Sequence, residues 1–293
     1  MINDIVTKRK QDFADGTHTE LRQQQNKSRS VGIISGNLTS NSRSEVSGVS
    51  ARVYKDGVYG FSSMAEISDD AARSVLGAAT ENAKFMASRA GRPASIAPVA
   101  TDAVVRDCNV SDPEQKVYTE FAKELDGYIE KKYKNLSGRG VYIRCDSMEK
   151  LIAVSDGADG HTIIPRSYVY IRMTAETPSG VPVELFEPFG GFGTFDTVFT
   201  SPESLYEKVD GVYERIMKKR EGVYAEAGER TCILSGTLAG MLAHEAVGHT
   251  VEADLVLGGS VAAHCLGKQV ASPIVNLTDF AHDAFGAPCP LPV

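Results

Sequence analysis

The sequence has little of what a secreted, disulfide-held protein needs. It contains no tryptophan and only five cysteines in 293 residues, and none of the cysteines forms a Cys-x-x-Cys pair. An odd, scattered set indicates a reducing compartment rather than a disulfide framework. The N-terminal ten residues also lack the apolar segment of a signal peptide. We therefore expect a cytoplasmic protein. The cysteines are Cys108, Cys145, Cys232, Cys265 and Cys289.

Long apolar runs and basic stripes are missing as well. No run approaches the roughly 18 apolar residues that a membrane-spanning helix requires. The formal net charge is −7, with 38 acidic residues against 31 basic ones. A nucleic-acid-binding domain usually carries a basic patch, which this chain does not show. We expect neither a membrane nor a nucleic acid among its partners.

The alternation of strand-like and helix-like segments predicts an α+β fold in more than one unit. Residues 1–100 are predicted to form an N-terminal α/β unit, and residues 101–222 a middle region of helices and antiparallel strands. Residues 223–293 are predicted to begin a β-rich C-terminal domain that carries a His-Glu-x-x-x-His helix. A segment rich in proline and alanine, residues 92–103, is interpreted as the linker between the first two parts.

Local signals predict the individual elements. Asp56-Gly57 suits a type I′ hairpin turn, because both central residues of that turn need a positive φ. Gly190–Gly193 lacks the setting of a phosphate loop and is interpreted as a flexible loop. Helices are predicted near residues 1–14, 67–91, 112–132 and 201–222, and strands near residues 19–25, 29–35, 46–54, 58–61, 141–145, 151–155, 168–174 and 231–234.

The most informative stretch runs from Leu242 to Asp254. It holds His244, Glu245 and His249 within six residues of an apolar, helix-like segment. A neutral imidazole is a good zinc ligand, and a neighbouring carboxylate can take the proton from metal-bound water. The stretch is therefore a candidate metal site.

The spacing of the two histidines puts a condition on that site. In a regular α-helix, residues five apart point about 140° away from each other. Two ligands for one ion then require a local widening such as a π-bulge, or a helix that ends between them. Gly248 is the expected place of the distortion, since glycine accepts unusual backbone angles.

An ordinary helix with two incidental histidines and a surface glutamate is the alternative interpretation. A His-Glu-x-x-x-His string by itself is only suggestive. Its helical context and the further acids Glu252 and Asp254 favour the metal site.

Several strings carry a family resemblance: Val49–Ser63, Pro165–Tyr168, Leu238–Gly240, His244–His249, Glu252–Asp254 and Gly267–Lys268. Together they resemble the TldD branch of the TldD/PmbA family, also called "modulator of DNA gyrase". The resemblance implies a zinc-dependent peptidase that acts on unfolded or ribosomally made peptides. It also implies a homodimer, or a heterodimer with a TldE/PmbA-like subunit. On this resemblance His244 and His249 are Zn²⁺ ligands and Glu245 is the general base.

The chain departs from the family pattern in one respect. The family's third metal ligand is a cysteine far downstream in a longer C-terminal domain. Inside this chain the candidates are His264, Cys265 and Cys289, none at the matching position. We therefore expect a C-terminally truncated chain with an incomplete metalloprotease domain. A non-catalytic dimerisation or interaction subunit is the alternative function, and a DNA- or gyrase-binding regulator is disfavoured by the acidic charge.

Overall fold

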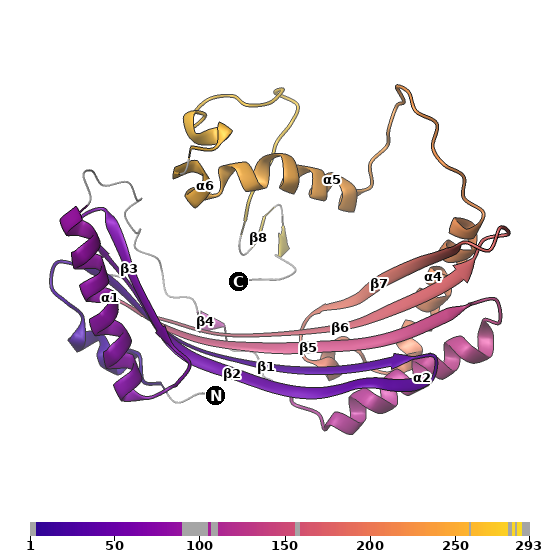
Figure 1. The fold of residues 1–293 in the computed structure, drawn as a ribbon, viewed down its shortest axis with the longest axis horizontal. Coiled ribbons are helices and arrows are strands. Elements are labelled where there is room, and N and C mark those ends of the chain that lie inside the picture. The colour runs from indigo at the N-terminus through magenta and orange to yellow at the C-terminus, as the bar shows by residue number, and fades with distance from the viewer. Residues whose placement is uncertain are drawn as a thin grey trace. The chain divides into compact units, whose positions relative to one another are not determined.

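The computed structural model describes residues 4–89, 105–106, 111–155, 159–257, 259–280, 283–284 and 286–288. The described residues divide into two compact units, one reaching to Val223 and the other starting at Tyr224 (Figure 1). Within the described ranges, no helix combines the length and the apolar character that crossing a membrane requires. The mixture of helices and a mostly antiparallel sheet confirms the α+β class.

One long sheet organises the first unit. Its strand order is β3-β2-β1-β5-β6, and both β7 and β4 pair with β6. All pairings are antiparallel except that of β4, which runs parallel to β6. The strands are β1 (His18–Ile34), β2 (Asn37–Lys55), β3 (Val58–Met64), β4 (Val105–Arg106), β5 (Gly138–Val154), β6 (Gly160–Glu176) and β7 (Pro182–Phe192).

Helices cover the two ends of this sheet. Figure 1 shows α1 at one end of the strands and α2 and α4 at the other. The α1 helix packs on Leu21 of β1, whereas α2 and α4 pack with Val31 of the same strand. Alternate residues of a strand share a face, so both hydrophobic cores lie on one face of the sheet. The helical segments of this unit are η1 (Thr7–Asp12), α1 (Asp69–Arg89), α2 (Gln115–Lys132), α3 (Phe195–Val198), η2 (Pro202–Leu205) and α4 (Tyr206–Arg220).

The hairpin and the main helices agree with the sequence patterns. Asp56 and Gly57 have φ values of 47° and 86°, which confirms the left-handed turn between β2 and β3. The predicted helix at residues 1–14 is instead a short 3-10 helix, η1, within its described part. The expected linker at residues 92–103 lies outside the described residues.

Several strand predictions were too short, and one predicted loop belongs to a strand. The predicted strands 19–25 and 29–35 fall in the single strand β1, which ends at Ile34. The predicted strands 141–145 and 151–155 fall in β5, which ends at Val154. In both strands the polar middle residues form ladder pairs, which a hydrophobic pattern does not reveal. Gly190 and Gly191 lie within β7 rather than in a loop, paired with β6.

The second unit has little regular structure in its described part. It contains α5 (Gly236–Ala243), η3 (His244–Gly248), η4 (His249–Val251), α6 (Ala253–Leu257) and η5 (Val261–His264), with the two-residue strands β8 (Asp283–Ala284) and β9 (Ala287–Pro288). The predicted buried strand at residues 231–234 is absent there: this segment is irregular, and Ile233 is 98% exposed. A β-rich C-terminal domain and the domain limits at residues 100 and 222 remain predictions.

Gly60 of β3 provides a test of how closely α1 approaches the sheet. A Cβ atom at this position would overlap the backbone of Ala79 and Ala83 in α1. We expect Gly60→Ala to lower the free energy of unfolding by about 1–3 kcal/mol, because the helix must move. Thermal and urea unfolding of the purified chain measure the effect.

Gly77, on the exposed face of α1, is the matched control. A Cβ there would meet nothing within 4 Å. Gly77→Ala should raise the stability by about 0.5–1 kcal/mol through helix propensity alone. Equal effects of the two substitutions would contradict the close approach.

Candidate metal centre

A capped helix delivers the histidines. The hydroxyl oxygen of Ser235 accepts a hydrogen bond from the backbone N–H of Leu238 at 3.3 Å, which satisfies one of the free donors at the start of α5. The helix then runs through an apolar segment to Ala243. His244 follows directly, at the beginning of η3.

The η3 segment is a π-helical turn. The backbone N–H of His249 donates to the carbonyl oxygen of His244, five residues earlier, instead of the four of an α-helix. The two imidazole rings therefore meet, with centroids 4.3 Å apart and planes inclined at 64°. The local widening predicted from the five-residue spacing is confirmed.

Gly248 acts differently from the prediction. Its φ and ψ are −49° and −56°, which any residue in a helix can adopt. A Cβ added to Gly248 would lie 3.5 Å from Nδ1 of His244, an ordinary contact. Neither the backbone angles nor the contacts of a Cβ therefore require a glycine at this position.

Three potential ligand groups converge at the turn. One donor atom each from His244, Glu245 and His249 lies within 4.8 Å of the others, and all three residues are exposed. Oε2 of Glu245 is 3.8 Å from Nε2 of His249. The structure thus brings the three residues together in space as well as in sequence.

Glu252 orients one of the two rings. Its Oε1 lies 2.6 Å from Nδ1 of His249. A carboxylate only accepts, so Nδ1 carries the hydrogen and the neutral ring keeps its lone pair on Nε2. This hydrogen bond, together with the charges of Glu252 and Glu245, raises the pKa of His249. A carboxylate behind a histidine is a common outer partner of metal sites.

The other candidates do not join this group. His264 is exposed at the end of η5, and Sγ of Cys265 donates to the carbonyl oxygen of Val261 at 3.7 Å. Neither belongs to the His244 cluster among the described residues. For Asp254 only the backbone is described, in α6, and Cys289 lies outside the described residues.

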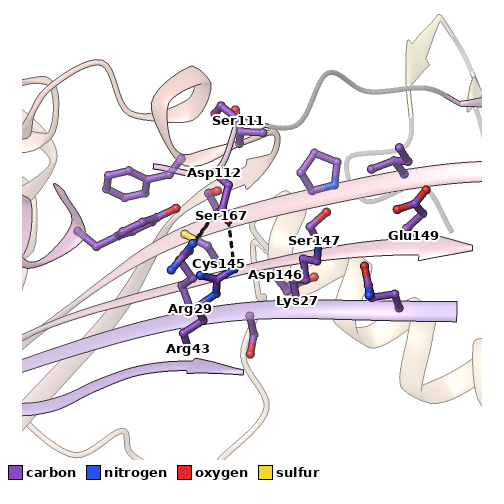
Figure 2. Close-up of a pocket in the computed structure, with 17 residues that line it drawn as sticks. Lys27, Arg29, Arg43, Ser111, Asp112, Cys145, Asp146, Ser147, Glu149 and Ser167 are labelled. Carbon is purple, nitrogen blue, oxygen red and sulfur yellow. Dashed lines mark hydrogen bonds and ion pairs between the residues drawn. The ribbon is translucent and has the colours of Figure 1, made fainter. Parts of the chain in front are cut away.

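A concave site in the first unit was missed by the sequence patterns. We call it the mid-sheet pocket: a cavity of about 570 Å³ over the centre of the sheet, lined by residues that include Lys27, Arg29, Arg43, Asp112 and Cys145 (Figure 2). The available signal was the polar stretch from Gln25 to Arg29 between apolar halves of one strand. It predicts an uncovered part of the sheet only once the strand is known to be continuous.

Family models match three consecutive parts of the chain. "PmbA/TldA metallopeptidase domain 1" matches residues 19–83, the "central domain" residues 107–234, and the "C-terminal domain" residues 227–288. Together they extend over most of the sequence.

Individual relatives are similar over shorter stretches. A metalloprotease of Methanocaldococcus jannaschii is 32% identical over 142 residues, which cover 47% of this chain and 30% of the relative. A "zinc metalloprotease TldD homolog" of Saccharolobus solfataricus is 35% identical over 66 residues, 22% of this chain and 15% of the relative. The matched part of the chain thus spans less than a third of these relatives.

A solved structure shows the same fold at low identity. TldE from Thermococcus kodakarensis superposes with a TM-score of 0.55 at 14% identity, covering 73% of this chain and 46% of that one. A likeness at this identity concerns the fold alone.

Cys145 of the mid-sheet pocket should be an unreactive thiol. Burial raises its pKa to about 11, so the thiolate that reacts with alkylating reagents is scarce at neutral pH. At pH 7.5 we expect iodoacetamide to modify the exposed Cys232 well before Cys145. The labelling rate of Cys145 should rise about tenfold for each pH unit between 8 and 10, because the thiolate fraction does. Peptide mass spectrometry follows each site, and rapid labelling of Cys145 at pH 7.5 would contradict its burial.

Proposed function

Because this chain belongs to the PmbA/TldD metallopeptidase family, we propose that it is a zinc-dependent peptidase subunit of the TldD type. The observation that supports this most directly is the π-helical turn, which gathers His244, Glu245 and His249. A straight α-helix would point the two histidines in different directions. A chance occurrence of the same residues in a regular helix would not bring the two rings together.

The donor set suits zinc. Imidazole nitrogens and carboxylate oxygens are its usual ligands, and His249 has its outer carboxylate partner in Glu252. We assign His244 and His249 as zinc ligands. Bound zinc would supply Lewis-acid polarisation of a carbonyl and a water of lowered pKa.

Glu245 is assigned as the general base. Its carboxylate lies beside Nε2 of His249, so it is on the side of the ring that faces the proposed metal. From there it can take a proton from the attacking water and pass it to the leaving amine. Glu252 holds the His249 ring in one tautomer during these steps.

The proposed substrates are unfolded or ribosomally made peptides, and the proposed assembly is a homodimer or a pair with a TldE/PmbA-like subunit. Many apolar side chains of the second unit are exposed, among them Leu266 at 97% and Ile274 at 89%. Among the described residues, no buried core residue lies beyond Ile216. Exposed apolar surface of this kind is typical of a surface that another polypeptide covers.

The proposed location is a reducing compartment, the cytoplasm. The free thiols of Cys145, Cys232 and Cys265 support it.

Substitutions at the turn separate metal binding from catalysis. His244→Ala and His249→Ala should each abolish stoichiometric zinc, because each removes a ligand. Glu245→Gln should keep the zinc and lower peptide hydrolysis by about 100- to 10,000-fold, since only the base is lost. Zinc per chain is measured by mass spectrometry and hydrolysis with a fluorogenic peptide.

Glu252→Ala should weaken zinc about 10- to 100-fold by releasing the His249 ring. Glu226, an exposed glutamate paired with Arg230, offers a matched control in Glu226→Ala, which should change nothing. Zinc retained by both histidine variants would refute the ligand assignment.

A non-catalytic dimerisation subunit is the second candidate. It is favoured by one observation: within the described residues, no cysteine joins the His244 group. A catalytic zinc site usually has three protein ligands and a water molecule. If the native chain holds no zinc and hydrolyses peptides no faster than Glu245→Gln, the peptidase proposal is refuted and the second candidate is favoured.

The mass of the particle tests the assembly. We expect sedimentation measurements to give a particle mass of twice the 31.5 kDa of one chain, or to show a complex with an added TldE-type subunit. A chain that stays monomeric and does not associate with such a subunit at micromolar concentration would contradict both the homodimer and the heterodimer.

A further inference from the structure

The mid-sheet pocket occupies the part of the sheet that neither hydrophobic core covers. On β1 the buried Leu21 belongs to the α1 core and the buried Val31 to the α2 core. Between them Lys27 and Arg29 line the pocket on the same face, opposite Ser147 and Cys145 of β5. The pocket-lining stretch from residue 25 to residue 29 is about 13 Å long, at about 3.3 Å per residue. That is the length of four extended residues.

Positive charge is in excess on one side of the pocket. Asp112 accepts a hydrogen bond from Nε of Arg29 at 2.7 Å, drawn in Figure 2, and lies 3.7 Å from Nη2 of Arg43. Lys27 is exposed, and no hydrogen bond or ion pair to its ammonium group is found within the described residues. Three cations thus face a single carboxylate.

The remaining acids of the pocket do not compensate this excess. Asp146 is 3.9 Å from Arg166, its cross-strand neighbour on β6. Oε1 of Glu149 lies 3.0 Å from Nε2 of His161. Each of these carboxylates lies beside a side chain other than the three cations. Lys27 is therefore available to an anion, whereas Arg43 shares the single carboxylate of Asp112 with Arg29 and keeps excess positive charge beside it.

The rest of the lining offers apolar surface and hydroxyl groups. Tyr118 and Phe195 form an aromatic wall, with ring centroids 4.6 Å apart, and Ile163 and Pro165 of β6 add apolar surface. Ser147 and Ser167 place hydroxyl groups between them. A cavity of about 570 Å³ is within the range of small-ligand sites.

We propose that the mid-sheet pocket binds the free C-terminal carboxylate of a short, extended peptide. Lys27 and Arg43 pair with the carboxylate, and Asp112 holds the Arg29 guanidinium in place beside them. The preceding peptide residues lie along the strands, against Ile163 and Pro165. This inference rests on the proposed peptidase function, because hydrolysis creates new C-terminal carboxylates. It assigns the chain a second peptide-binding site, within the first unit.

Isothermal titration calorimetry with tetra-alanine tests the proposal. The full chain carries Glu245→Gln, so that the peptide is not consumed. We expect the free-carboxylate peptide to bind about tenfold or more tightly than its C-terminal amide, as expected for a charge-assisted hydrogen bond. Lys27→Met and Arg43→Met should each remove most of this preference and leave the weak binding of the amide unchanged.

Lys123→Met is the matched control, because Lys123 is an exposed lysine of α2 that does not line the pocket. It should bind both peptides as the parent does, and unchanged thermal unfolding establishes that the variants are folded. Equal affinity for the free-carboxylate peptide and its amide would overturn the proposal. An undiminished preference for the free carboxylate in both Lys27→Met and Arg43→Met would also overturn it. Inorganic phosphate that binds as tightly as tetra-alanine would show a general anion site instead, and would overturn the peptide assignment.

The zinc measurements are independent of this outcome. If the chain shows no preference for the free carboxylate while the native chain holds zinc and hydrolyses peptides, only the second peptide-binding site is refuted. A retained preference in a chain that neither holds zinc nor hydrolyses peptides refutes only the peptidase.

Discussion

The antiparallel pairing of β1 with β5 is the constraint on which the first unit depends. It extends from Glu20 to Ile34 without a break in register, so segments from both sides of the predicted linker share one sheet. The strands are longer than either hydrophobic core, and helices cover only the two ends. The same register places Arg29 opposite Cys145 and leaves the polar centre open as the mid-sheet pocket. A shift by one residue would turn every one of these side chains to the other face.

The candidate metal centre depends on a different kind of interaction. One backbone hydrogen bond, from His249 to His244, sets the separation of the two rings, and Glu252 then fixes the orientation of one of them. All of these residues lie within nine positions of the sequence. This centre is local and exposed, whereas the pocket is assembled from distant strands and helices. The two sites therefore place different demands on the fold: the first requires a correct turn, the second a correct register.

Much of the chain could be predicted from local patterns, and the failures share a cause. The Asp56-Gly57 turn and the helix of residues 69–89 follow from residue preferences that act over a few positions. The centre of β1 could not be recognised, because its polar side chains belong to a strand held by its neighbours' hydrogen bonds. The reverse happened at residues 231–234, where an apolar run that looks like a buried strand is exposed and irregular. Hydrophobicity indicates a need for burial, but it does not specify the surface that provides it.

The sequence by itself determined the composition of the candidate metal centre and showed that a regular helix could not form it. Two histidines five residues apart cannot face one ion from a regular helix, so the spacing required either a local widening or a helix that ends between them, and the structure has the widening. It also placed the distortion at Gly248, although this glycine has ordinary helical backbone angles. Tertiary structure decided where three cationic side chains gather around one carboxylate, that of Asp112. Lys27, Arg43 and Asp112 come from three separate segments of the chain. Only strand pairing and the position of α2 bring them to one pocket, and these long-range contacts are not specified by local residue patterns.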